Sequence, residues 1–180
     1  MYNKGDYVVY RHDICMIKDI REDKVKGNTY YVMTPIDDDS LIIDIPTENR
    51  MGFLRSVISF ENAKGLIERI PAIEPLKEIN EKNLEIKYKE MLNTGKYEDL
   101  IKIIKTTYLR NENRINNKKR ISEKDSTYFK LAEKYLYNEL SISLSMTVEE
   151  VKDYIFEIVS KHEHEWFKFS RKYYWQVKIK

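Results

Sequence analysis

The first part of the chain alternates short apolar runs with turn residues, which is the pattern of β-strands. These runs are rich in β-branched and aromatic residues, and we expect strands at Tyr7–Tyr10, Cys15–Ile20, Thr29–Thr34, Leu41–Ile45 and near Phe53–Val57. Lys26-Gly27-Asn28 predicts a tight hairpin turn, because Gly and Asn tolerate positive φ. Pro46 ends the fourth strand, since proline cannot donate to a sheet ladder. The pattern predicts a small antiparallel β-barrel.

After Ser59 the apolar period becomes that of helices. Ser59 is expected to cap a short helix that Pro71 stops. Asn80 or Asn83 caps the next helix, which ends at Gly95. Its apolar face carries Leu84, Tyr88, Met91 and Leu92.

The following helix has an i, i+3, i+4, i+7, i+11 stripe, formed by Tyr97, Leu100, Ile101, Ile104 and Tyr108. We interpret the polar stretch 111–120 as the end of this helix plus a loop. Ser122 with Asp125, and the capping-box pair Thr147 and Glu150, predict two further helix starts. The second part of the chain is therefore expected to be a compact all-helical domain.

These patterns predict a two-domain α+β protein, with domains at residues 1–57 and 58–160 and an extension at 161–180. The chain has no run of about 18 apolar residues, so we expect no contact with a membrane. Its start lacks the apolar stretch of a secretory signal, and its single cysteine, Cys15, excludes an internal disulfide. We expect a cytoplasmic protein.

The net charge of +2 is unevenly distributed along the chain. Residues 1–57 carry −2, residues 58–160 carry 18 charges of each sign, and residues 161–180 carry +4. Any contact with nucleic acid must therefore come from local clusters and be weak on its own. The internal basic residues concentrate at Lys87, Lys89, Arg110, Arg114, Lys118, Lys119, Arg120 and Lys124. A solvated helix end would have the same composition.

Signals of catalysis or metal binding are weak. His162-Glu163-His164-Glu165 lacks the i, i+4 histidine spacing of a zinc helix. His12 and Asp13 beside Cys15 form a poor ligand set, and Asp37–Asp39 lacks the glycine and glutamate of a calcium loop. We expect no enzyme, no cofactor and no metal site.

The order of several loose motifs resembles the CarD/CdnL family of bacterial transcription regulators over roughly residues 1–160. In the first domain they are Gly5-Asp6-Tyr7-Val8-Val9-Tyr10, Val25-Lys26-Gly27, Tyr30-Tyr31-Val32, Ile45-Pro46 and the segment from Gly52 to Val57. In the second domain they are Asn83-Leu84-Glu85-Ile86-Lys87-Tyr88-Lys89, Ser122-Glu123-Lys124, and Ala132, Leu136, Glu139 and Leu140. Leu84 stands at the family's tryptophan position.

The resemblance implies an adaptor without chemistry of its own. A Tudor-like or SH3-like barrel would bind the lobe of the RNA polymerase β subunit through Arg21, Lys24, Ile42 and Asp44. The helical domain would contact promoter DNA at the upstream edge of the bubble through Asn83, Leu84, Lys87, Tyr88, Lys89 and Lys124. Such a protein would stabilise the open complex, act as a monomer and be nucleoid-associated.

Several alternatives remain open at this point. Leu84 lies on the apolar stripe of its helix, so it is either a core residue or a wedge between base steps. The family's arginine positions toward polymerase carry Asp23 and Asp44 here, and the loop at residues 11–15 is one residue shorter. The chain is alternatively a protein–protein adaptor that never touches DNA, or a nucleic-acid-binding module without a polymerase partner. The aromatic and basic tail, Trp166 to Trp175, either stacks on bases or packs against the helices.

Overall fold

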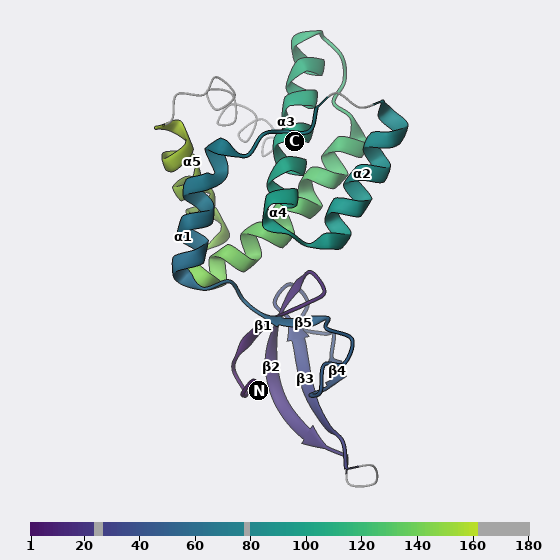
Figure 1. Ribbon diagram of the computed structural model, residues 1–180, viewed down its shortest axis with the longest axis vertical. Coiled ribbons are helices and arrows are strands. Elements are labelled where there is room, and N and C mark those ends of the chain that lie inside the picture. The colour runs from purple at the N-terminus through teal and green to yellow at the C-terminus, as the bar shows by residue number, and fades with distance from the viewer. Residues whose placement is uncertain (24–26, 78–79, 162–180) are drawn as a thin grey trace. The chain divides into compact units, whose positions relative to one another are not determined.

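The computed structural model describes residues 1–23, 27–77 and 80–161 (Figure 1). It divides into two compact units, Met1–Ile58 and a second unit that begins at Ser59. The first is an antiparallel sheet of five strands, and the described part of the second contains five α-helices. The predicted α+β class is therefore confirmed. None of the described helices is both long enough and apolar enough to cross a bilayer.

The strands of the N-terminal unit pair mainly with their sequence neighbours. Their order across the sheet is β4-β3-β2-β1-β5, and all pairings are antiparallel. Their bounds are β1 Tyr7–Tyr10, β2 Asp13–Glu22, β3 Thr29–Pro35, β4 Ile43–Pro46 and β5 Leu54–Ser56. Among the strand pairings of the described residues, none joins β4 to β5, so the sheet is open. The predicted closed barrel is not confirmed.

The long strand β2 places the core of this unit. Its first half pairs with β1, with Val8 opposite Cys15. Its pairing with β3 shifts by one residue between Ile17 and Asp19, a β-bulge that bends the strand. The residues that form the buried core are Val8, Cys15, Ile17, Tyr31, Met33 and Leu54.

The helical unit follows the expected cap residues. Its helices are α1 Phe60–Arg69, α2 Glu81–Thr94, α3 Tyr97–Asn116, α4 Glu123–Leu144 and α5 Val148–Ser160, with a 3-10 turn, η1, at Ile70–Ala72. The N-terminal caps of four helices accept a backbone N–H at the third helical position, and these caps are Ser59, Asn80, Ser122 and Thr147. Thr147 and Glu150 form the complete capping box. Gly95, in the left-handed conformation, ends α2.

A buried lysine fixes the end of α1 against α3. Lys105 is 3% exposed, and its Nζ donates to the carbonyl oxygens of Ile70 and Ile73 at 2.6 Å and of Pro71 at 3.3 Å. These carbonyls belong to the 3-10 turn η1 and to Ile73, which follows it, and the Ile70 carbonyl also accepts from the Ile73 backbone N–H at 3.1 Å. Burial lowers the pKa of Lys105 to about 8.

Candidate nucleic-acid interface

Part of the α2 segment that resembles the family's DNA contact is buried in the core of the helical unit. Leu84 is 4% exposed and Tyr88 is fully buried, whereas Asn83 is exposed near the helix start. The Tyr88 ring packs on the ring of Tyr128 in α4, with centroids 5.1 Å apart. This burial agrees with packing as the role of Leu84. As a DNA wedge, Leu84 stays a prediction that requires α2 to leave its neighbours.

The lysines of the predicted DNA contact are engaged in ion pairs. Lys87 Nζ lies 3.2 Å from Glu90. Glu85 accepts from Lys124 at 2.6 Å and from Lys89 at 3.0 Å. These two hydrogen bonds lower the pKa of Glu85, and the bond from Lys124 has the larger effect. These three cations therefore have a nearby carboxylate that competes with a DNA phosphate.

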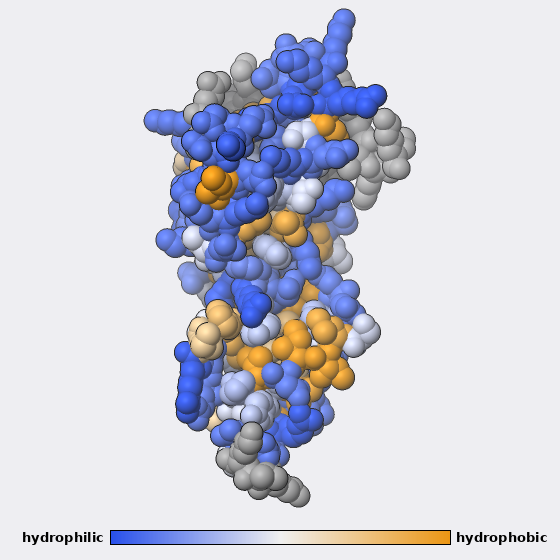
Figure 2. Space-filling view, turned by 90° about the vertical axis from the view of Figure 1, so that its right-hand side faces the viewer, coloured by the Kyte–Doolittle hydropathy of each residue, from blue (hydrophilic) through white to orange (hydrophobic). Residues whose placement is uncertain are grey.

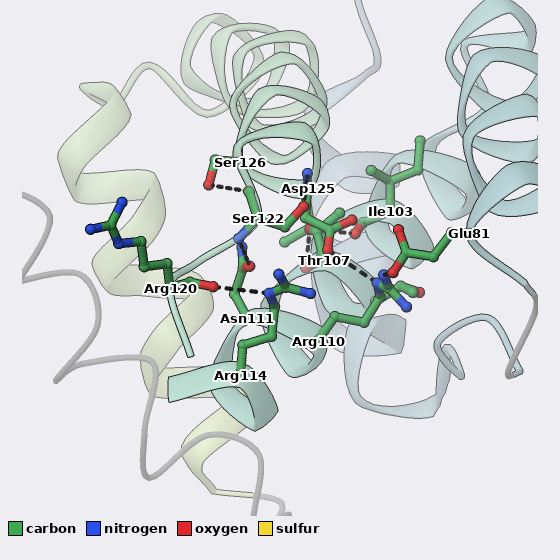
Figure 3. Close-up of polar contacts among 12 residues, drawn as sticks. Glu81, Ile103, Thr107, Arg110, Asn111, Arg114, Arg120, Ser122, Asp125 and Ser126 are labelled. Atoms are coloured by element: carbon green, nitrogen blue, oxygen red, sulfur yellow. Dashed lines mark hydrogen bonds and ion pairs between the residues drawn. The ribbon is translucent and has the colours of Figure 1, made fainter. Parts of the chain in front are cut away.

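Arg110 ties α3 to both α2 and α4 (Figure 3). Its guanidinium contacts Glu81 at 2.6 Å and Asp125 at 3.1 Å. Asp125 is 1% exposed, so this pair is desolvated on the carboxylate side and holds the start of α4 in place. Arg110 is half-buried and paired with two carboxylates, so it adds little free charge to the surface.

The last residues of α3 and the loop that follows, which together we call the basic tip (residues 114–121), carry the remaining cations. Its residues 115–121 are exposed. The tip is fastened at its base, because Arg114 Nε donates to the Arg120 carbonyl at 2.9 Å and Asn111 accepts from the Ser122 backbone N–H at 2.9 Å (Figure 3). The guanidinium of Arg120 points away from the other labelled side chains in that view. The sequence had already placed these basic residues in one cluster, but it gave no reason to prefer them over α2.

The predicted polymerase contact lies at the β4 edge of the N-terminal unit. Arg21 and Asp44 form an ion pair across β3, and Ile42 is 67% exposed just before β4. Lys24 lies outside the described residues. Figure 2 shows hydrophobic side chains gathered on this unit, in the lower half of the view. Its exposed large hydrophobic residues include Leu41, Ile42, Met51 and Phe53.

The other candidate groups do not converge on a reactive site. Cys15 is fully buried, and burial raises the pKa of its thiol to about 11. Burial also lowers the pKa of His12. Asp38 accepts from the hydroxyl and the backbone N–H of Ser40, which makes a local turn. No group of three His, Cys, Asp or Glu residues in the described part of the chain could hold a metal ion. The segment His162-Glu163-His164-Glu165, which lacks the spacing of a zinc helix, lies outside the described residues.

Comparison with protein-family models and with curated proteins found no match to this chain.

Proposed function

We propose that this protein is a transcription adaptor of the CarD/CdnL kind. In this proposal the N-terminal unit binds the lobe of the bacterial RNA polymerase β subunit and the helical unit contacts upstream promoter DNA. The observation that carries the proposal is the exposed β4 edge, where Ile42 is 67% exposed beside the Arg21–Asp44 pair. An exposed edge strand is a template for pairing with a strand of another protein.

The proposed contact also has a geometric basis in the sheet. We interpret the open sheet as a partly closed Tudor-like or SH3-like barrel, because the ten-residue strand β2 pairs with β1 through residues 13–16 and continues alone with β3 as far as Glu22. The bulge after Ile17 increases its bend. The strand order makes the short strands β4 and β5 the two edges of this sheet.

Charge decides what kind of partner surface would fit. Residues 1–57 carry a net charge of −2, with Asp37, Asp38 and Asp39 preceding the β4 edge. Arg21 is already neutralised by Asp44. We therefore expect the partner to supply backbone hydrogen bonds, an apolar contact for Ile42 and a basic rather than acidic rim.

The proposed mechanism is linkage and involves no chemistry. A factor that binds the melted promoter more tightly than the closed one stabilises it by the difference in affinity. A tenfold difference corresponds to about 1.4 kcal/mol. The proposed protein acts as a cytoplasmic, nucleoid-associated monomer, without a cofactor, and its contact with DNA alone is weak.

The second candidate is a protein–protein adaptor that uses the same edge and never touches DNA. The pairing of Lys87, Lys89 and Lys124 with carboxylates, and the burial of Leu84, favour it. The two candidates share the polymerase contact and differ only in the role of the helical unit.

The test is a binding titration of the full chain against the isolated β-subunit lobe. We expect saturable micromolar binding, weakened about tenfold or more by Ile42→Glu, because a charge would replace the apolar contact. Ile86→Glu is the matched control, since Ile86 is also exposed but lies on α2. Absence of wild-type binding, or equal binding by both variants, contradicts the proposal. If binding is present, an unchanged open-complex lifetime on a promoter template favours the second candidate.

A further inference from the structure

The basic tip is built on a strained helix end. Asn117 caps α3, and Lys118 adopts a left-handed conformation with φ of 55°. The backbone N–H of Lys118 donates to Ile115 at 2.9 Å and that of Lys119 donates to Arg114 at 2.8 Å. This is the Schellman pattern, whose left-handed position usually carries glycine. A lysine is conformationally unfavourable at this position, so it costs the fold some stability.

Side-chain hydrogen bonds hold the tip in one shape. Arg114 donates to the Arg120 carbonyl, and Asn117 donates to the carbonyl and side-chain oxygens of Asn113 at 2.7 and 2.8 Å. Asn111, which is 3% exposed, receives the backbone N–H of Ser122. A loop ordered in advance loses little conformational freedom when it binds a partner.

The tip presents three successive cations whose side chains have no partner among the described residues. They are Lys118, Lys119 and Arg120, and all three are exposed. They differ in this respect from the paired lysines on α2 and at the start of α4. Figure 1 shows the loop at one end of the helical unit, and Figure 2 shows mainly hydrophilic residues over that end.

We propose that the basic tip contacts the phosphate backbone of duplex DNA. Duplex DNA carries one negative charge per about 1.7 Å of axis, a density that three cations on one turn can meet. The tip has no aromatic side chain for stacking on bases, which disfavours single-stranded nucleic acid. Its exposed apolar residues are only Ile115 and Ile121, too few for stable insertion into a membrane surface.

This inference rests on the proposed DNA contact of the helical unit and moves it from α2 to the tip. It does not depend on polymerase binding. Contacts of this kind position a protein on DNA without reading its sequence. We therefore expect the protein to bind DNA duplexes of equal length and unrelated sequence with the same affinity.

The experiment measures binding of the full chain to a short mixed-sequence duplex by fluorescence anisotropy. Three phosphate contacts give a salt slope of about −2.7, or a roughly 40-fold loss of affinity between about 50 and 200 mM salt. The triple variant Lys118→Gln, Lys119→Gln, Arg120→Gln should lose this contribution. The control variant Lys96→Gln, Lys130→Gln, Lys161→Gln removes the same charge from exposed positions on other parts of the unit. It should keep the slope.

A single substitution separates binding from folding. Lys118→Gly removes one cation and relieves the left-handed backbone, so its unfolding midpoint should rise while the salt slope falls by about 0.9. Three results overturn the inference. In the first, the tip variants keep the salt slope of the wild type; in the second, the control variant loses as much slope as the triple variant. In the third, the wild type does not bind the duplex. Binding to phosphatidylserine vesicles without binding to duplex overturns it in favour of a membrane. If the protein binds duplex DNA but not the β-subunit lobe, the polymerase proposal is refuted and the inference on the tip stands.

Discussion

Leu84→Ala separates the two roles that the sequence left open for this residue. Leu84 is 4% exposed and lies on the buried face of α2 with Tyr88, Met91 and Leu92. If it packs in the core, truncation removes buried apolar atoms and leaves a cavity. If it is a wedge for DNA, the side chain must be available at the surface and its loss should hardly affect folding.

The structure sets the size of the expected effect. Removing the buried side-chain carbons beyond Cβ loses about 2 kcal/mol of transfer free energy. The cavity adds about 1 kcal/mol, because the neighbouring side chains relax only partly. A total of about 3 kcal/mol also corresponds to a fall in the thermal unfolding midpoint of roughly 12 °C for a unit of this size.

The assay is urea unfolding followed by circular dichroism at the helical band. All five described α-helices belong to the second unit, so this signal follows the unit that contains Leu84. Ile86→Ala is the matched control on the same helix, because Ile86 is 56% exposed, and it should change the free energy of unfolding by less than about 1 kcal/mol. A Leu84→Ala protein within about 0.5 kcal/mol of the wild type would refute the packing argument and return Leu84 to the DNA surface.

Three further substitutions test buried polar groups of the helical unit. Lys105→Met should destabilise the protein by about 2 kcal/mol at neutral pH, since it removes the buried ammonium that donates to the carbonyl oxygens of Ile70 and Ile73. The pKa of Lys105 is lowered to about 8 in the folded state. Above that pH the folded state therefore binds fewer protons than the unfolded state. The free energy of unfolding of the wild type should rise relative to that of Lys105→Met as the pH increases toward 10. Burial raises the pKa of Glu133 to about 7, so the wild type loses stability as the pH rises from about 4.5 to 7. Over this range the free energy of unfolding of Glu133→Gln, measured by urea titration, should rise relative to the wild type by on the order of 1–2 kcal/mol. Tyr88→Phe should unfold at the same or a higher urea concentration than the wild type, because the buried Tyr88 hydroxyl has no hydrogen-bond partner among the described residues. A flat difference with pH for either titrating residue, or a clear loss of stability for Tyr88→Phe, would contradict these expectations.

The helix starts could be predicted from the sequence because capping is a local interaction. Ser59, Asn80, Ser122 and Thr147 each cap the helix that follows within a few residues. The polar stretch after Tyr108 also divides as expected, into the end of α3 and a loop. Its buried polar anchor, Asn111, could not be foreseen, since its partner at Ser122 lies beyond the loop.

The edge of the sheet and the state of the surface charges required three-dimensional information. The expected fourth strand began at Leu41, but β4 begins at Ile43, because the Leu41 backbone N–H bonds to Asp38 in a turn. The pair between Lys89 and Glu85 has the helical i, i+4 spacing and is visible in the sequence. The pair between Lys124 and Glu85 joins two helices and is not, so one-dimensional charge counting overstated the free charge on α2.

The burial of Cys15 makes the chain suitable for labelling with fluorophores at chosen positions. The thiolate is the reactive form of cysteine, and with a pKa of about 11 only about one native thiol in ten thousand is ionised at neutral pH. Two cysteines introduced at exposed positions outside the proposed contacts, Met51 in the first unit and Lys130 in the second, would therefore react with maleimide dyes and leave the native residue unmodified. Energy transfer between the two dyes could then follow the distance between the two units while the protein binds its partners.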